Sequence, residues 1–418
     1  MVVLPNAAPA PSAGSYADGF APLAERFASQ LRGGAEVGAG LTVYHRGRCV
    51  VQVWGGSADL RRATPWASDT RIVVFSVTKG LVAMALALLA DRGQLDWDAP
   101  VASYWPGFAA HGKAEITVRT LVNHRAGLVG LDERIALDDC IEPERHGWLV
   151  DVLERQRPAW EPGTAQGYHA ITYGLYVREL FERIARESLG TFLRRELFEP
   201  LDADVSLGTP PEVDARIATL YPPRTALRVV RMLAAAVRGA SAEGRMIRGA
   251  LRRGSPARAA FLNPRVGPEG IAEYNSVRVR RAELAWASAT ASAHGLARAY
   301  LPFASGGTAL GRTFLRGSTL TPIHARQSWS ERDVVLHKPI GWSQGFLKEE
   351  TTLFSPHPES FGHAGMGGAL GWCDPVADLA VGYVMNRLDW RIRSPRALAL
   401  CHALYACDPV RDRETRVA

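Results

Sequence analysis

One stretch of the chain, from Gly80 to Ala90, restricts the possible folds more than any other. Its sequence, GLVAMALALLA, is almost wholly apolar and rich in strong helix formers. A helix that is apolar on every side has to be covered on every side, which places it inside a protein core. The stretch is far shorter than the roughly 20 residues that cross a bilayer. It therefore predicts the central helix of a layered domain, ending near Gly93, where glycine suits a helix C-cap.

The two ends of the chain carry the strand signals. Two β-rich runs, 41–45 and 49–54, flank a short link that contains Gly47 and indicate a β-hairpin. A further strand is predicted over 379–385, and helices are predicted over 20–31 and 395–405. These segments predict an antiparallel sheet that is built from both chain ends and flanked by helices.

The middle of the chain is predicted to be mainly helical. Strand signals largely fade there, and prolines separate helical stretches such as 175–186 and 227–238. We therefore expect an α+β fold with two domains. The α/β sandwich domain is discontinuous and comprises residues 1–105 and 284–418, and the inserted helical domain comprises residues 106–283.

The positive charge of the chain comes almost entirely from arginine. The formal net charge is +7, and the only lysines are Lys79, Lys113, Lys338 and Lys348. A lysine at a chemically meaningful spacing is therefore informative. Residues 224–281 are strongly basic, but no nucleic-acid-binding motif or interleaved aromatic pattern accompanies them. This segment is interpreted as a solvated helical face, with no nucleic acid as partner.

The cysteines and the N-terminus indicate the compartment. The five cysteines are scattered and lack C-x-x-C spacing, so they predict neither a disulfide framework nor a zinc site. Buried free thiols are typical of a reducing compartment. Residues 1–15 lack the basic and apolar regions of a signal peptide. These observations predict a cytoplasmic protein that uses no metal or cofactor and does not contact a membrane.

The motif Ser76-Val-Thr-Lys79 stands directly before the apolar helix. Residues three apart lie on one face of a helix, so the Lys79 side chain can reach the Ser76 hydroxyl. Serine is a weak nucleophile until a base takes its proton, and a lysine desolvated in a core can be neutral enough to do so. The helix N-terminus favours a developing oxyanion. S-x-x-K is a known catalytic motif, and the alternative is an ordinary surface serine and lysine.

Two further segments are candidates for the same site. Tyr168 follows the turn-forming sequence Trp160-Glu-Pro-Gly163. A phenol has a reference pKa near 10 and needs a cationic neighbour, here Lys79, to act as a base near neutrality. The alternative is an ordinary core tyrosine. The glycine-rich segment 361–372 is expected to form an edge strand whose backbone approaches a ligand closely, or a flexible turn.

These motifs together resemble the serine β-lactamase and penicillin-binding-protein superfamily, and within it the β-lactamase-like carboxylesterases called family VIII esterases. The resemblance runs from about residue 37 to residue 405. Ser76-x-x-Lys79 matches the first family motif, Tyr168-His-Ala170 occupies the Tyr-x-Asn position, and His363-Ala364-Gly365 occupies the Lys-Thr-Gly position. Residues 116–128 are similar to a further family landmark.

The resemblance implies two-step acyl transfer without a cofactor. Ser76 is expected to attack a short-acyl carboxylic ester, with Lys79 and Tyr168 moving the proton to the leaving alcohol. The oxyanion is expected at the backbone N–H groups of Ser76 and, by motif position, Met366. His363, Ala364 and Gly365 are expected to line the substrate site.

Other functions stay open from the sequence. A β-lactamase or D-amino-acid peptidase shares the nucleophile, but Ala170 and His363 replace the family asparagine and lysine that help hold such substrates. An acyltransferase is a second alternative, and a non-catalytic or nucleic-acid-binding scaffold is a third. A competing nucleophile pattern, G-x-S-x-G at Gly341–Gly345, contains Ser343, but the residues after it read as an arm of a hairpin rather than the helix that this pattern requires.

Overall fold

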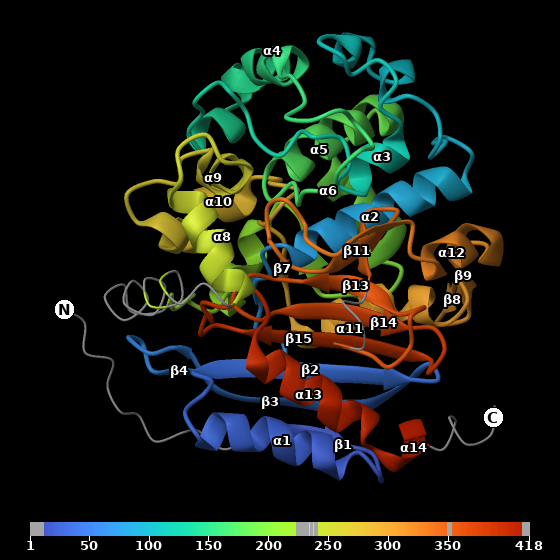
Figure 1. The fold of residues 1–418 in the computed structure, drawn as a ribbon. Coiled ribbons are helices and arrows are strands. Elements are labelled where there is room, and N and C mark those ends of the chain that lie inside the picture. Colours follow the sequence, from blue (N-terminus) through green and yellow to red (C-terminus); the bar gives the residue numbers. More distant parts are fainter. Residues whose placement is uncertain (1–11, 223–233, 235–236, 238–240, 349–352, 412–418) are drawn as a thin grey trace.

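A large antiparallel sheet forms the centre of the molecule. The structure is a computed structural model that describes residues 12–222, 234, 237, 241–348 and 353–411 (Figure 1). The strand order is β1-β3-β2-β15-β14-β13-β12-β11-β10, with β4 paired to β3. The strands are β1 (Ala13–Tyr16), β2 (Gly38–His45), β3 (Arg48–Asp59), β4 (Thr64–Pro65), β10 (Ser328–Ser330), β11 (Ile340–Ser343), β12 (Phe346–Lys348), β13 (Phe361–Ala364), β14 (Leu370–Asp374) and β15 (Leu379–Met385). Strand β15 pairs with β2, so the two ends of the chain meet in the middle of this sheet.

Helices cover both faces of the sheet. Helices α1 (Ala21–Arg32) and α13 (Pro395–Tyr405) pack on one face, and α14 (Asp408–Arg411) follows α13. Helices α2 (Val77–Asp91) and α11 (Ala293–Ala304) pack on the opposite face, and α12 (Gly317–His324) lies beside α2. Successive residues of a strand point to opposite faces. Accordingly Leu41 and Val381 contact the α1 and α13 side, whereas Gly40 and Gly382 lie against α11.

A mainly helical part lies above and to the left of α2 in Figure 1. Its helices are α3 (Val118–Val122), α4 (His146–Arg155), α5 (Thr172–Ala185), α6 (Leu189–Leu193), α8 (Ala242–Leu251), α9 (Pro256–Leu262) and α10 (Val277–Arg281). A small sheet joins this part to the rest of the molecule, because β6 (Val205–Ser206) pairs with β7 (Thr290–Ala291), which also pairs with β5 (Ile72–Val73).

The predicted fold class is confirmed. The strand over 379–385 and the helix over 395–405 have the predicted bounds, and the hairpin of β2 and β3 is present. The division into domains at residues 105 and 284 stays a prediction, and most of the helical stretch predicted over 227–238 lies outside the described residues.

One sequence prediction about the sheet is wrong. Strand β13 is not an edge strand, because it pairs with both β12 and β14, and β10 is the edge at this end of the sheet. The hairpin of β11 and β12 supplies the extra partners, and β10 pairs with β11. Any free N–H near β13 therefore has to come from the turn after the strand.

Helix α2 is buried along almost its whole length, as its composition predicts. Residues Val77 to Leu89 are all inaccessible to solvent, and Gly93 follows the helix with a φ of 70°. Within the part of the chain that the structure describes, no helix combines the length and apolarity needed to cross a membrane.

Candidate active site

Ser76 lies at the N-terminus of the central helix. It lies three residues after the end of β5 and forms the N-cap of α2. Phe75, just before it, has a φ of 47°, in the left-handed region that side chains other than glycine rarely adopt. Such a conformation costs roughly 1–3 kcal/mol and persists only where surrounding contacts impose it. Here the buried Phe75 ring packs against Tyr274, with the ring centroids 5.2 Å apart.

Lys79 is fully buried beside Ser76. Its Nζ lies 3.2 Å from Ser76 Oγ and 3.2 Å from the carbonyl oxygen of Trp286. Burial lowers the pKa of Lys79 well below its ordinary value, and no carboxylate offsets this effect. A neutral amine donates to the Trp286 carbonyl and keeps a lone pair for the Ser76 proton. The arrangement therefore allows Lys79 to accept the Ser76 proton.

Tyr168 also contacts Ser76. Its hydroxyl donates to Ser76 Oγ at 3.0 Å, and Lys79 Nζ lies 5.0 Å from its ring centroid. Burial raises the pKa of Tyr168 to about 12, against smaller lowering effects of the Ser76 hydrogen bond and Arg393. The expected lowering of this pKa by a cationic Lys79 is thus wrong, because burial removes the charge of the lysine itself. Tyr168 is a neutral phenol that donates a proton.

The backbone and ring of Tyr168 are held by residues from a distant segment. The Tyr168 N–H donates to Asp333 Oδ1 at 3.1 Å, and that oxygen also accepts from the backbone N–H groups of Val335 and Leu336. The Tyr168 ring stacks on Trp342 at 5.5 Å with an interplanar angle of 5°. Asp333 and Trp342 therefore position Tyr168, and neither was predicted from the sequence as a site residue.

The third motif lies next to Ser76 at the end of β13. A Cβ added to Gly365 would lie 2.3 Å from the carbonyl oxygen of Val74, so this backbone touches the segment that presents Ser76. The Met366 and Ser76 N–H groups donate no hydrogen bond to the protein within the described residues. They are thus free for a ligand, as the expected oxyanion site requires. Ala364 is half-buried between His363 and Gly365.

His363 is buried and neutral. Its Nδ1 lies 2.8 Å from the carbonyl oxygen of Ala364, which places the proton on Nδ1. Burial lowers the pKa of His363 well below 6.5. Its Cβ lies 3.3 Å from a Cβ added to Gly80, so it packs over the first turn of α2. The residue at the family lysine position therefore adds no positive charge.

A cluster of neutral aromatic groups surrounds these residues. His124 Nδ1 accepts from the His169 backbone N–H at 3.1 Å, and the His124 ring lies 5.1 Å from Tyr168 and 4.1 Å from Trp342. Burial lowers the pKa of His169 to about 3 and that of His124 well below 6.5. His124 falls within residues 116–128, the segment similar to a family landmark, and that similarity was the only sequence feature that pointed to it. Ala170 is buried and offers no side-chain amide to a ligand.

Ser343 does not form a nucleophile elbow. It lies in β11, is fully buried, and its hydroxyl donates to the Pro322 carbonyl at 3.2 Å. Strand β12 follows it instead of a helix, as the sequence predicted. Residues 349–352 of that predicted hairpin arm lie outside the described residues.

Comparison with known proteins identifies the family that has this arrangement. The β-lactamase family model matches residues 23–403 of the chain. The chain belongs to the β-lactamase family. It is 34% identical over 379 residues to esterase/β-lactamase LipL of Mycobacterium tuberculosis, a match that covers 88% of this chain and 81% of that protein.

Solved structures of β-lactamase-like proteins match nearly the whole chain. A family VIII carboxylesterase is 33% identical with a TM-score of 0.82, covering 95% of this chain and 99% of that one. A penicillin-binding protein homologue from Caulobacter crescentus is 32% identical with a TM-score of 0.81 over the same shares. The predicted family and its carboxylesterase branch are thus confirmed, and the chain is a serine hydrolase with the β-lactamase fold.

Proposed function

We propose that this β-lactamase-family enzyme hydrolyses short-acyl carboxylic esters through an acyl-enzyme on Ser76. The observation that carries the proposal is the double contact of Ser76 Oγ, 3.2 Å from Lys79 Nζ and 3.0 Å from the Tyr168 hydroxyl. A nucleophile within hydrogen-bond distance of both a base and a proton donor is the arrangement that covalent acyl transfer requires.

The proposed first step is acylation. The neutral Lys79 amine takes the Ser76 proton while Oγ attacks the ester carbonyl carbon, and the N–H groups of Ser76 and Met366 stabilise the oxyanion. Collapse of the tetrahedral intermediate breaks the bond to the leaving alkoxide. Tyr168 protonates the alkoxide and recovers a proton from the Lys79 ammonium.

The proposed second step is deacylation. A water molecule gives a proton to Lys79, directly or through Tyr168, and attacks the acyl carbon. The tetrahedral intermediate then releases the carboxylic acid, and Ser76 Oγ regains its proton. No step needs a metal or a cofactor. With an alcohol or amine in place of water, the same step becomes the acyltransferase alternative.

The surroundings of Ser76 support a neutral ester as substrate. His363, at the position where the family pattern has lysine, is uncharged, and Ala170 has no amide to anchor a substrate side chain. The family VIII carboxylesterase and the LipL relative are both named as esterases. These observations favour small neutral esters over anionic β-lactams or D-amino-acid peptides.

One observation favours a residual β-lactamase activity. Arg393 lies near enough to lower the pKa values of Tyr168 and His363, so positive charge does reach the site. A carboxylate on a β-lactam is attracted by such charge. LipL is named as an esterase and a β-lactamase. This activity is proposed as secondary, because His363 adds no positive charge and Ala170 has no side-chain amide.

Three arginines at the end of the basic segment 224–281 are paired with carboxylates of the protein itself. Arg278 lies within ion-pair distance of Asp138 and Glu142, and Arg280 and Arg281 both pair with Asp214.

A cytoplasmic location and a small-molecule partner stay predictions.

The experiment that tests the proposed nucleophile uses two serine variants. Ser76→Ala is expected to lower kcat for p-nitrophenyl butyrate by several orders of magnitude, because the nucleophile acts as a unit with its base. Ser343→Ala is the matched control and is expected to keep most of the activity. Activity that survives Ser76→Ala but not Ser343→Ala would contradict the assignment.

A further inference from the structure

The turn that carries Met366 has little conformational restraint of its own. It connects β13 to β14, and its internal hydrogen bonds run from Gly365 N–H to the Ala369 carbonyl at 2.7 Å and from Gly368 N–H to the Gly365 carbonyl at 3.2 Å. Gly367 and Gly368 have φ values of 91° and 132°, where only glycine is unstrained. The direction of the Met366 N–H therefore depends on what holds the neighbouring Gly367 peptide.

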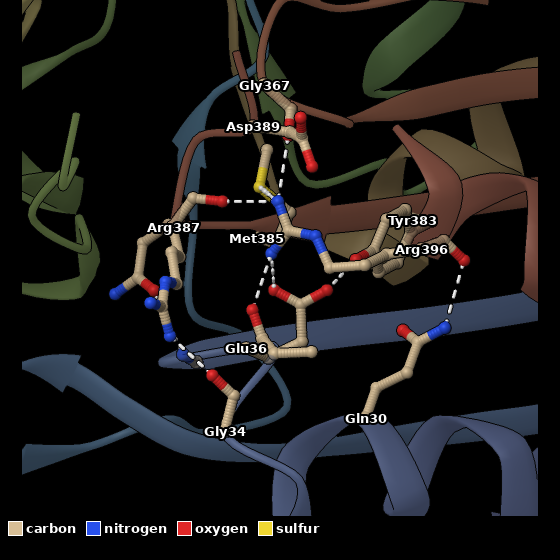
Figure 2. A network of polar contacts seen from close by, with 12 residues as sticks. Gln30, Gly34, Glu36, Gly367, Tyr383, Met385, Arg387, Asp389 and Arg396 are labelled. Atoms are coloured by element: carbon tan, nitrogen blue, oxygen red, sulfur yellow. Dashed lines mark hydrogen bonds and ion pairs between the residues drawn. The ribbon is translucent and has the colours of Figure 1, made fainter. Parts of the chain in front are cut away.

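Arg396 holds that peptide from the start of α13. Its Nη2 donates to the Gly367 carbonyl at 3.0 Å, and the Asp389 backbone N–H donates to the same oxygen at 3.0 Å (Figure 2). Nη2 also donates to the Arg387 carbonyl, and Nη1 donates to the Ala35 carbonyl at 3.0 Å. A single guanidinium thus links the turn to the segment after β15 and to the segment after α1.

The guanidinium is itself fixed by a buried carboxylate. Glu36 accepts from Arg396 Nη1 and from the Tyr383 hydroxyl, and its side chain is inaccessible to solvent (Figure 2). The Arg396 side chain is only 10% exposed. The Gln30 side chain donates to the Arg396 carbonyl at 3.0 Å and so holds the backbone of the same residue. A buried arginine with this many acceptors has one orientation available.

We propose that Arg396 is a positioning residue for hydrolysis, held by Glu36 and fixing the Gly367 peptide so that the Met366 N–H faces the acyl oxygen in the transition state. The inference rests on the proposed function, since it assumes Ser76 as nucleophile and Met366 as oxyanion donor. Arg396 touches neither substrate nor Ser76 and acts through the turn.

The charge on Glu36 makes this support dependent on pH. Burial raises the pKa of Glu36 to about 7, against the lowering by Arg396, Tyr383 and Arg387. Asp389 adds negative charge near Arg396 and Tyr383. As the pH falls through about 7, Glu36 takes up a proton and loses its ionic hold on Arg396. The turn is then less restrained, and kcat falls on the acid side.

The experiment compares three arginine variants on p-nitrophenyl butyrate. Arg396→Met is expected to lower kcat about tenfold to a hundredfold with KM within about twofold, because an oxyanion donor acts mainly in the transition state. Arg396→Lys is expected to fall between wild type and Arg396→Met, since one ammonium cannot span the same acceptors. Arg387→Met is the matched control, because the exposed Arg387 side chain contacts the Gly34 carbonyl but not the turn. All variants are compared at about pH 9, where Glu36 stays ionised even though loss of Arg387 raises its pKa.

Glu36→Gln adds a pH readout. Its kcat is expected to lose the dependence on pH near 7 that titration of Glu36 gives to wild type. If Arg396→Met does not fold, the double variant E36Q/R396M leaves no buried unpaired carboxylate and is measured instead. Folding of each variant is checked by circular dichroism.

The outcomes separate this inference from the proposed function. Unchanged kcat in folded Arg396→Met or E36Q/R396M, or an equal loss of kcat in Arg387→Met, would overturn the positioning role. Ser76→Ala is measured on the same substrate. If Ser76→Ala keeps activity, the proposed function fails; if Ser76→Ala is inactive while Arg396→Met keeps its kcat, only the positioning role fails.

Discussion

Burial gives the lysines of this chain different roles. Lys113 and Lys348 are also inaccessible, but each donates to two or more backbone carbonyl oxygens, and burial lowers the pKa of each to about 8. Lys79 has one carbonyl partner, at Trp286, and Ser76 as its other neighbour. Lys113 and Lys348 thus join backbone segments through hydrogen bonds, whereas Lys79 faces the Ser76 hydroxyl.

The first residue-scale prediction concerns pH. Because burial lowers the pKa of Lys79, its amine is neutral, and active as a base, at pH values far below its ordinary pKa. Activity is present above the lowered pKa and lost as the pH falls through it. With the pKa of Tyr168 at about 12, the phenol stays protonated throughout. We expect kcat/KM for p-nitrophenyl acetate, measured from about pH 5 to 10, to level off well below pH 10. A rise of about tenfold per pH unit up to pH 10 would indicate an ordinary lysine.

The second residue-scale prediction concerns the phenol. Tyr168→Phe keeps the stacking on Trp342 and removes only the hydroxyl that contacts Ser76. Loss of one general acid is expected to lower kcat by roughly 10²–10⁴. Steady-state kinetics on p-nitrophenyl butyrate measure the effect, with thermal unfolding as the check on folding. A change of only a few-fold would make Tyr168 a core tyrosine.

The sequence predicted the contact between Ser76 and Lys79 better than the contacts that hold Tyr168 in place. Ser76 and Lys79 share one helix, so their spacing alone predicts the contact. Asp333 and Trp342 meet Tyr168 only after the chain has folded, and no local pattern links residues so far apart. Trp342 belongs to the G-x-S-x-G sequence that contains Ser343. It lies near the site because it stacks on Tyr168, and that sequence pattern does not predict this contact.

At the scale of elements, glycines allow helix α11 to lie directly on the sheet. A Cβ added to Gly382 in β15 would lie 2.2 Å from the Ala293 carbonyl oxygen and 2.7 Å from the Ala297 nitrogen. A Cβ added to Gly371 in β14 would lie 2.4 Å from the Tyr300 ring. These contacts set the distance between α11 and the strands behind the site.

Gly382→Ala is therefore expected to destabilise the protein. Overpacking against helix backbone is expected to lower the free energy of unfolding by about 1–3 kcal/mol, because neither element can shift alone. The control is Gly147→Ala in α4, where an added Cβ meets no atom within 4 Å. This control is expected to be neutral or stabilising by roughly 0.5–1 kcal/mol. Chemical denaturation measures both; equal stability of the two variants would contradict the close approach.

The predicted elements were most accurate where a segment was long and regular. Strand β15 and helix α13 have a clear apolar pattern and were predicted with their observed bounds. Strands β10, β11 and β12 have only three or four residues each and contain serine, glycine or lysine, so their periodicity is too short to read. The hairpin arm after Ser343 was predicted, but its pairing with β13 was not, so β13 was expected to be an edge strand.

At the scale of the whole molecule, the site lies where the helical part meets the sheet. Ser76 and Lys79 come from α2, Tyr168 from the segment before α5, and His363 and Met366 from the end of β13 and the turn after it. Arg71 joins the two parts nearby, since its guanidinium contacts Ser206 and the Thr290 carbonyl at 2.8 Å each. The order of the motifs along the sequence predicted a site between the sheet and the helical part. It did not predict which residues, such as Arg71, connect these two parts.

Kinetics of two substrate classes on one preparation test the proposed preference for neutral esters. A site with neutral His363 and without the family asparagine is expected to favour neutral esters over anionic β-lactams. We predict that kcat/KM for p-nitrophenyl butyrate exceeds kcat/KM for nitrocefin at least about a hundredfold, equivalent to about 2.7 kcal/mol in transition-state free energy. Comparable values for the two substrates would contradict the account and make β-lactam hydrolysis the primary function.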